Sequence, residues 1–174
     1  MPELLAGLTA PLAARLVARG DTVAVSESST GGLISAALLS IPGASAYFLG
    51  GGVIYTQTAR RRLLGIPDDA VRGIRSSTEA AALLNARTVR ERLGTTWGLG
   101  ETGAAGPAGN RYGDAAGHSC IAASGPLERS RTIETGRADR EANMWAFTRA
   151  AFALLDECLD ELEFGEPKAK RSET

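Results

Sequence analysis

The residues best suited to chemistry lie in the stretch TVAVSESSTGG, residues 22–32. β-branched residues without helical spacing predict a short strand over residues 22–25, and residues 33–39 predict a helix that stops at Pro42 and Gly43. Backbone N–H groups at such a helix start attract anions, and a serine there could be a nucleophile whose oxyanion those groups hold. The same residue types also cap helices with no catalytic role. The local pattern leaves both readings open.

A second turn of unusual composition, ETGAAGPAGN, occupies residues 101–110 and follows a predicted strand over 96–100. Its glycines and proline exclude regular structure over most of its length. Its spacing matches neither a Walker A loop nor a dinucleotide fingerprint. Because ligands of open α/β sheets bind beyond the ends of strands, residues 28–32 and 102–109 are predicted to face each other across one pocket.

Helices and strands alternate along most of the chain, and together they must position these two turns. The periodicity predicts further strands over residues 52–55, 117–123 and 129–135, and further helices over residues 2–20, 58–64, 80–93 and 140–162. Pro11 is expected to kink or split the first helix, and Gly50, Gly51 and Gly52 are expected to form a loop or a close approach. The predicted fold is α/β, a three-layer α/β/α sandwich with a mixed, mostly parallel sheet of about five strands.

Composition and length indicate an ordinary globular protein. The chain has 174 residues, 44% of them hydrophobic and 22% charged, which predicts one domain over residues 1–164. Residues 165–174 are polar and predict a disordered tail. The formal net charge of −1 argues against a nucleic-acid partner, and no apolar run is long enough to cross a membrane.

The sequence offers little for metal or disulfide chemistry. It contains one histidine, His118, and two distant cysteines, Cys120 and Cys158. No His/Cys metal cluster can be built from these residues, so neither a metal nor another cofactor is expected. Two distant thiols and an N-terminus without a basic start predict a reduced, cytoplasmic protein without a signal peptide.

Several motifs in order resemble the C-terminal domain of the CinA family, the competence- or damage-inducible proteins. They are ESSTGG at 27–32, IPGAS at 41–45, FLGG at 48–51, Tyr55, LLGI at 63–66, and TG with AGP at 102–107. The resemblance covers about residues 11–162, and it identifies the chain as a divergent, stand-alone member of the family.

The resemblance implies an activity and a set of site residues. Active members deamidate nicotinamide mononucleotide, releasing ammonia and leaving nicotinic acid mononucleotide, and are commonly homodimers. Ser28 matches the nucleophile. The residues matching substrate contacts, or placed beside them, are Ser29, Thr30, Gly31, Gly32, Tyr55, Thr102, Gly103, Gly106, His118 and Arg140. Arg140 could meet the phosphate of the substrate.

The chain departs from the family at the expected base. Active members resemble a Ser–Lys dyad, and the matching position here is Arg60, whose guanidinium cannot lose its proton near neutral pH. The only lysines, Lys168 and Lys170, lie in the predicted tail. Glu101 stands where the family usually has an apolar residue, and His118 where it often has threonine.

Three readings follow from this departure. In the first, the chain is an amidohydrolase in which Glu27, Glu101 or His118 accepts the Ser28 proton. In the second, Arg60 and Glu101 form a buried ion pair, and the pocket binds a nucleotide or another small amide without turning it over. In the third, the pocket is vestigial and the protein has a structural role.

Overall fold

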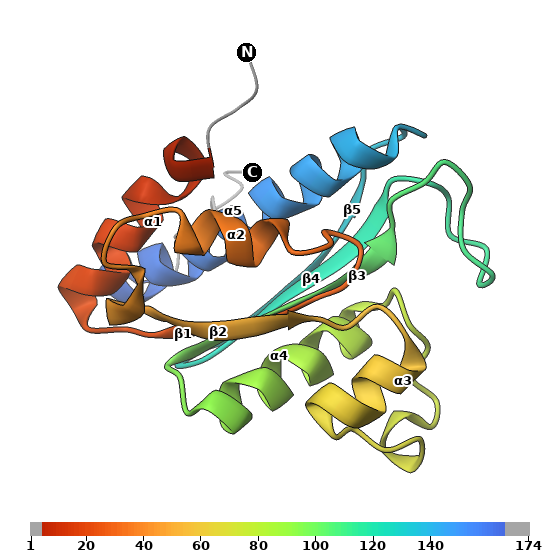
Figure 1. Cartoon of the computed structure of the whole chain (residues 1–174), viewed down its shortest axis with the longest axis horizontal. Helices are drawn as coiled ribbons and strands as arrows, with labels where there is room; N and C mark the ends of the chain where they lie inside the picture. The colour runs from red at the N-terminus through yellow and green to blue at the C-terminus, as the bar shows by residue number, and fades with distance from the viewer. Residues whose placement is uncertain (1–4, 166–174) are drawn as a thin grey trace, which may run out of the picture.

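A five-stranded open sheet forms the centre of the computed structural model, which describes residues 5–165 (Figure 1). Its strand order is β2-β1-β3-β4-β5. The strands are β1 (Val23–Glu27), β2 (Phe48–Val53), β3 (Trp97–Ala104), β4 (His118–Ser124) and β5 (Glu128–Glu134). Residues 1–4 and most of the predicted tail, residues 166–174, lie outside the described part.

The sheet is mixed, as predicted, but it has no parallel majority. β1 pairs in parallel with β2 and β3, whereas β3–β4 and β4–β5 are antiparallel. The carboxyl ends of β1 and β3 therefore lie at the same edge of the sheet. This places the turn after Glu27 beside the end of β3, as the two Gly-containing turns predicted.

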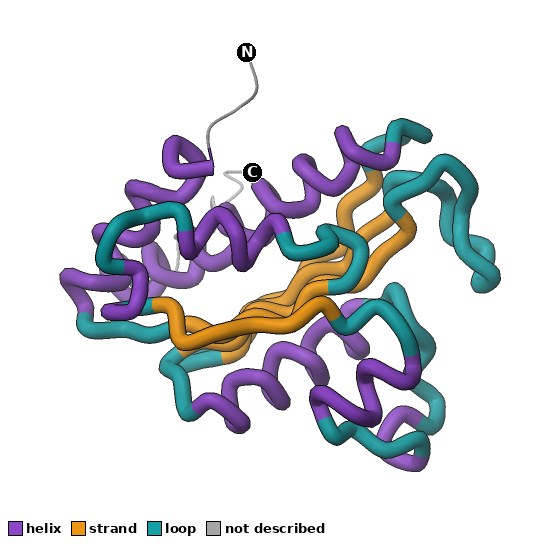
Figure 2. The backbone as a smooth tube through the Cα atoms, viewed as in Figure 1, coloured by secondary structure: helices purple, strands orange, loops and turns teal. Residues whose placement is uncertain are grey.

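Helices cover both faces of the sheet and make three layers. α1 (Leu5–Arg19), α2 (Leu33–Leu39) and α5 (Arg140–Phe164) lie on one face, and α4 (Glu79–Leu93) lies on the other together with the short turns α3 (Gln57–Ala59) and η2 (Arg60–Leu64) (Figure 2). Short 3-10 turns, η1 (Ala44–Ala46) and η3 (Asp69–Val71), complete the elements. None of the described helices is long and apolar enough to span a membrane.

The main core lies between the sheet and the layer of α1, α2 and α5. Its largest members are fully buried, among them Trp97, Tyr47, Leu16, Leu155 and Leu159. The opposite layer packs more closely, because β3 presents glycines to α4. A Cβ at Gly98 would lie 2.0 Å from the carbonyl oxygen of Ala86, and one at Gly100 would lie 2.0 Å from that of Ala82. This close approach brings the N-terminal end of α4 to the end of β3.

Several elements differ from the sequence prediction. β3 continues to Ala104, so the first four residues of the 101–110 stretch belong to the strand, and the helix predicted over 58–64 is divided into α3 and η2. β2 begins at Phe48 and ends at Val53, so the three glycines at 50–52 form an edge strand and Tyr55 lies beyond it. Glycines hide a strand pattern because they supply neither β-branched side chains nor alternation. In the described residues, α1 is continuous through Pro11. Pro11 therefore neither ends nor splits the helix.

Candidate functional site

Ser28 follows the last residue of β1 and begins the turn that leads into α2. It is partly exposed and lines a cavity of about 690 Å³. Among the described residues its hydroxyl makes no hydrogen bond, whereas its backbone N–H donates to Glu101. The hydroxyl of Ser28 is therefore free to contact a bound molecule.

Glu27 caps α2 from the end of the strand. The helix has no local side-chain cap at Gly32, and the buried Glu27 carboxylate accepts hydrogen bonds from the first helical turn instead. The donors are the backbone nitrogens of Gly32, Ile34 and Ser35 at 3.0–3.1 Å and the hydroxyls of Thr30 at 2.7 Å and Ser35 at 2.6 Å. An anion at a helix start is favourable. Glu27 thus fills a structural role and does not contact the Ser28 hydroxyl.

Glu101 occupies the other side of the same turn. Its carboxylate, 1% exposed, accepts the backbone N–H groups of Ser28 at 2.9 Å and Thr30 at 3.1 Å. It also accepts the hydroxyls of Ser119 at 2.9 Å, Thr30 at 3.1 Å, and Ser29. The turn N–H groups that sequence reasoning assigned to an oxyanion are therefore held by a side chain.

Thr30 lies between the two carboxylates. Its Oγ1 is 2.7 Å from Glu27 Oε2 and 3.1 Å from Glu101 Oε2, and its single hydroxyl proton can serve one of them at a time. The predicted contacts Ser29, Thr30, Gly31 and Gly32 do not line the cavity. The hydroxyls of Ser29 and Thr30 and the N–H of Gly32 instead donate to the buried carboxylates of Glu101 and Glu27.

Arg60 lines the cavity but points its guanidinium at its own loop. Its Nη1 donates to the carbonyl oxygens of Ile66 at 3.2 Å and Pro67 at 2.9 Å, and its Nη2 contacts Asp68. Asp68 also accepts from Arg61 at 3.0 Å, and these two arginines lower the Asp68 pKa. The Arg60–Glu101 ion pair considered from the sequence does not form.

The cavity is lined by Ser28, by residues 54–58 with Arg60 and Arg61, by Val71 and residues 74–77 with the first turns of α4, by Thr102 with Gly103, and by residues 110–112. Arg60, Arg61, Arg75 and Arg111 line it, and among residues 5–165 no aspartate or glutamate does. Thr102 and Gly103 thus line the same cavity as Ser28, from the neighbouring strand β3. The walls favour an anionic ligand.

Tyr55 and Arg140 meet at the edge of the site. Tyr55 is 61% exposed and lines the cavity, and its hydroxyl accepts from Arg140 Nη2 at 3.3 Å. Arg140 Nη1 donates to the carbonyl oxygen of Gly106 at 2.6 Å. Neither Arg140 nor Gly106 lines the cavity, so Arg140 joins Tyr55 and the 101–110 segment to the start of α5.

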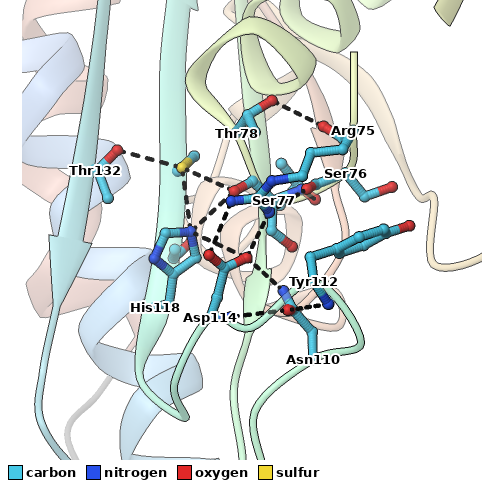
Figure 3. Close-up of polar contacts among 12 residues, drawn as sticks. Arg75, Ser76, Ser77, Thr78, Asn110, Tyr112, Asp114, His118 and Thr132 are labelled. Atoms are coloured by element: carbon cyan, nitrogen blue, oxygen red, sulfur yellow. Dashed lines mark hydrogen bonds and ion pairs between the residues drawn. The ribbon is translucent and has the colours of Figure 1, made fainter. Parts of the chain in front are cut away.

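His118 also lies outside the cavity wall. Its Nε2 donates to the Ser77 carbonyl at 2.9 Å (Figure 3), and its Nδ1 contacts Glu134. Burial alone would lower its pKa, but Glu134, the Ser77 carbonyl and the charge of Asp114 raise it. Both ring nitrogens are engaged by these partners, so neither is available as a base for Ser28. His118 instead fixes the Ser77 segment.

Ser77 is a site feature that the sequence did not reveal. It has φ 58°, the left-handed region, which costs a non-glycine residue free energy. Its N–H donates to Thr102 Oγ1 at 3.3 Å, and its carbonyl accepts from His118 and from Cys120 at 3.4 Å. These contacts hold the Ser77 backbone, and Ser77 lines the cavity.

Residues 110–114 form a compact turn that sequence reasoning also missed. Asn110 Oδ1 accepts the backbone N–H groups of Tyr112 at 3.0 Å and Asp114 at 3.1 Å. Arg75 forms two hydrogen bonds with Asp114, at 2.6 and 2.9 Å, and its guanidinium lies 5.5 Å from the Tyr112 ring centre (Figure 3). Arg75 lowers the Asp114 pKa to about 2. No local pattern links residues 39 positions apart.

Residues 6–159 match the family profile of the CinA C-terminal domain. The chain belongs to the CinA family. A CinA-like protein of Synechocystis is 37% identical over 138 residues, 79% of this chain and 33% of its own length. A CinA-like protein of Salinibacter ruber is 38% identical over 144 residues, 83% of this chain and 35% of its own length. The chain thus spans about a third of these CinA relatives.

Solved CinA structures share the fold. A CinA superfamily protein from Klebsiella pneumoniae superposes with a TM-score of 0.85 at 26% identity, covering 91% of this chain and 99% of the other. A competence/damage-inducible protein from Agrobacterium tumefaciens gives 0.82 at 27% identity, covering 92% and 98%. The three-layer CinA architecture therefore extends over nearly the whole chain.

Proposed function

We propose that the chain is an amidohydrolase acting on a nicotinamide-nucleotide-like substrate, with Ser28 as the nucleophile. The observation that carries the proposal is the state of the hydroxyls in the turn. Those of Ser29 and Thr30 are bonded to buried carboxylates, whereas that of Ser28 has no partner in residues 5–165 and faces the cavity. Ser28 is thus positioned to attack a carboxamide carbon.

The cavity supports a phosphorylated ligand. Its volume of about 690 Å³ is adequate for a mononucleotide, and its charged lining residues are four arginines. Asp68 neutralises part of the charge of Arg60 and Arg61, and Asp114 pairs with Arg75. The remaining positive charge complements a phosphomonoester, which carries about −1.5 to −2 at neutral pH.

The proposed reaction proceeds through an acyl-enzyme. Ser28 Oγ bonds to the carboxamide carbon, and the C–N bond breaks as the leaving nitrogen takes up a proton from water, so that ammonia leaves. A water molecule then hydrolyses the ester to the carboxylic acid and returns a proton to Ser28 Oγ. The Ser28 proton passes to solvent water in the cavity, because no described side chain able to accept it contacts Oγ. Arg60 stays protonated and acts only electrostatically. We therefore expect slow turnover.

A second candidate function follows from the lack of a described base in contact with the Ser28 hydroxyl. A protein without a base at Ser28 could bind the nucleotide and not hydrolyse it. The hydrogen bonds of Glu27, Glu101 and His118 favour this reading, since each is bonded elsewhere. Catalysis and binding are separated by assaying both on one protein.

The expected homodimer is a further part of the proposal. Large apolar side chains of the edge strand β2 and of α2, which packs against it, are 42–66% exposed, namely Leu49, Val53 and Leu39. The opposite edge, β5, is instead covered by ion pairs such as Arg131–Glu157 and Arg129–Glu161. An uncharged apolar edge is suited to a second copy. The molar masses of wild type and Leu49→Glu, measured by light scattering, test whether this edge forms a dimer.

The decisive experiment measures ammonia release from nicotinamide mononucleotide, together with binding of the same compound. Release by wild type that is lost in Ser28→Ala supports the amidohydrolase. Binding by both proteins with release by neither supports the second candidate. Absence of both binding and release would overturn the nucleotide assignment. A cytoplasmic location is expected and is tested by cell fractionation.

A further inference from the structure

The turn at Ser28 has little capacity left for a ligand anion. The N–H groups of Ser28 and Thr30 bind Glu101, and those of Gly32, Ile34 and Ser35 bind Glu27. The two buried carboxylates also place negative charge beside the turn. A phosphate at this helix start would meet occupied donors and like charge, so it must bind elsewhere in the cavity.

Three of the four arginines in the cavity wall already have carboxylate partners. Arg60 and Arg61 share Asp68, and Arg75 is bidentate with Asp114. Arg140, the phosphate contact expected from the sequence, donates to Gly106 and Tyr55 and does not line the cavity. Arg111 lines it and has no hydrogen bond or ion pair within residues 5–165.

The backbone that carries Arg111 is held in place. The N–H of Asn110 donates to the carbonyl of Asp114 at 3.0 Å, and Asn110 Oδ1 accepts from residues on the far side of the turn. The Arg75–Asp114 pair then joins this turn to the segment before α4 (Figure 3). Such a fixed loop reduces the entropy that binding costs.

Resting on the proposed function, we propose that Arg111 is the phosphate-binding residue of the cavity, with the ligand phosphate at the 110–112 wall and its amide at Ser28. The guanidinium supplies forked donors that match phosphate oxygens. The subsite selects phosphomonoesters over the corresponding nucleosides. Arg75 and Asn110 are positioning residues, because they act through the turn that presents Arg111.

The experiment compares the affinities of nicotinamide mononucleotide and nicotinamide riboside, which differ in the phosphate, at one ionic strength. Wild type should prefer the mononucleotide by about tenfold to a hundredfold, as expected for a charge-assisted contact. Arg111→Gln should abolish most of this preference and leave riboside affinity unchanged. Arg72→Gln removes the same charge from an exposed residue outside the cavity wall and should keep the preference.

Inorganic phosphate separates the subsite from the proposed function. Phosphate should shift the amide NMR signals of residues 110–112 in wild type and not in Arg111→Gln, whether or not the mononucleotide is hydrolysed. Mononucleotide binding with no preference over the riboside would overturn the subsite alone. Loss of preference in Arg61→Gln but not in Arg111→Gln would also overturn it. If neither nicotinamide compound binds, the phosphate titration still decides. Phosphate-induced shifts at residues 110–112 in wild type would support the phosphate subsite, and their absence would overturn it.

Discussion

The carboxylate of Glu101 lies 2.9 Å from the backbone nitrogen of Ser28, so the proposed nucleophile is joined to a buried anion by its own main chain. The two residues come from the ends of adjacent parallel strands, β1 and β3. Glu101 accepts five donors and meets no arginine in the described chain. Its role is to hold the turn that presents the Ser28 hydroxyl.

Replacing Glu101 should destabilise the protein. Glu101→Val leaves two backbone N–H groups and several hydroxyls without their acceptor, and should lower the free energy of unfolding by about 2–4 kcal/mol. Urea denaturation measures the change. Glu91→Gln, at an exposed position on α4, is the control and should change stability by less than about 0.5 kcal/mol. A Glu101→Val protein as stable as wild type would contradict this role.

Ser28 and Ser119 should separate activity from stability. Ser28→Ala removes a hydroxyl that has no described partner, so the free energy of unfolding should change by less than about 0.5 kcal/mol while ammonia release is lost. Ser119→Ala removes a donor to Glu101 and should cost about 1–2 kcal/mol. Denaturation and ammonia assays on both variants check the contrast. Equal destabilisation by the two substitutions would argue against a free Ser28 hydroxyl.

Arg60→Lys should increase the rate of ammonia release. A lysine in the cavity wall can lose its proton when desolvated and then accept one from Ser28, which arginine cannot do. The variant also loses contacts with Ile66 and Pro67, so its unfolding free energy should fall by about 1 kcal/mol. Arg61→Lys, the same change at the neighbouring wall residue, is the control. A variant that binds the mononucleotide but gains no activity would refute a missing base as the limitation.

The His118 contacts should make stability depend on pH. The folded-state pKa is raised above the ordinary 6.5, so the stabilisation is fully present below about pH 6.5 and is lost as the pH rises through the folded value. The groups facing the ring are Glu134, Asp114, Cys120 and the Ser77 carbonyl.

Urea denaturation of wild type and His118→Gln from pH 6 to 9 measures this dependence. The stability advantage of wild type should shrink as the pH rises. Glu134→Gln removes one contact that raises the pKa, so its loss of stability should begin at lower pH. An advantage that stays constant over this range would show that His118 is not protonated in the folded protein.

Local patterns were sufficient for the elements that carry the site. Residues 33–39 were predicted as a helix and form α2, and the predicted helix over 80–93 differs from α4 by one residue. Thr78 caps α4 by accepting the Ala81 N–H at 3.2 Å, a contact between residues three positions apart. Side-chain periodicity and capping depend on neighbours in sequence. The same local signals placed Ser28 at the end of a strand, and the usual position of ligands at strand ends predicted that Ser28 shares a cavity with Thr102 and Gly103.

The sequence by itself thus determined the α/β architecture, the family and the position of Ser28. The tertiary structure alone decided that Glu101 reaches Ser28 across 73 positions, that Arg60 bonds to its own loop, and that Arg75 fixes the turn carrying Arg111. A charged side chain chooses its partner from every group that packing brings near it. Residue type and spacing therefore determine the helices and strands, whereas the packing of the sheet and loops determines which side chains form hydrogen bonds with one another.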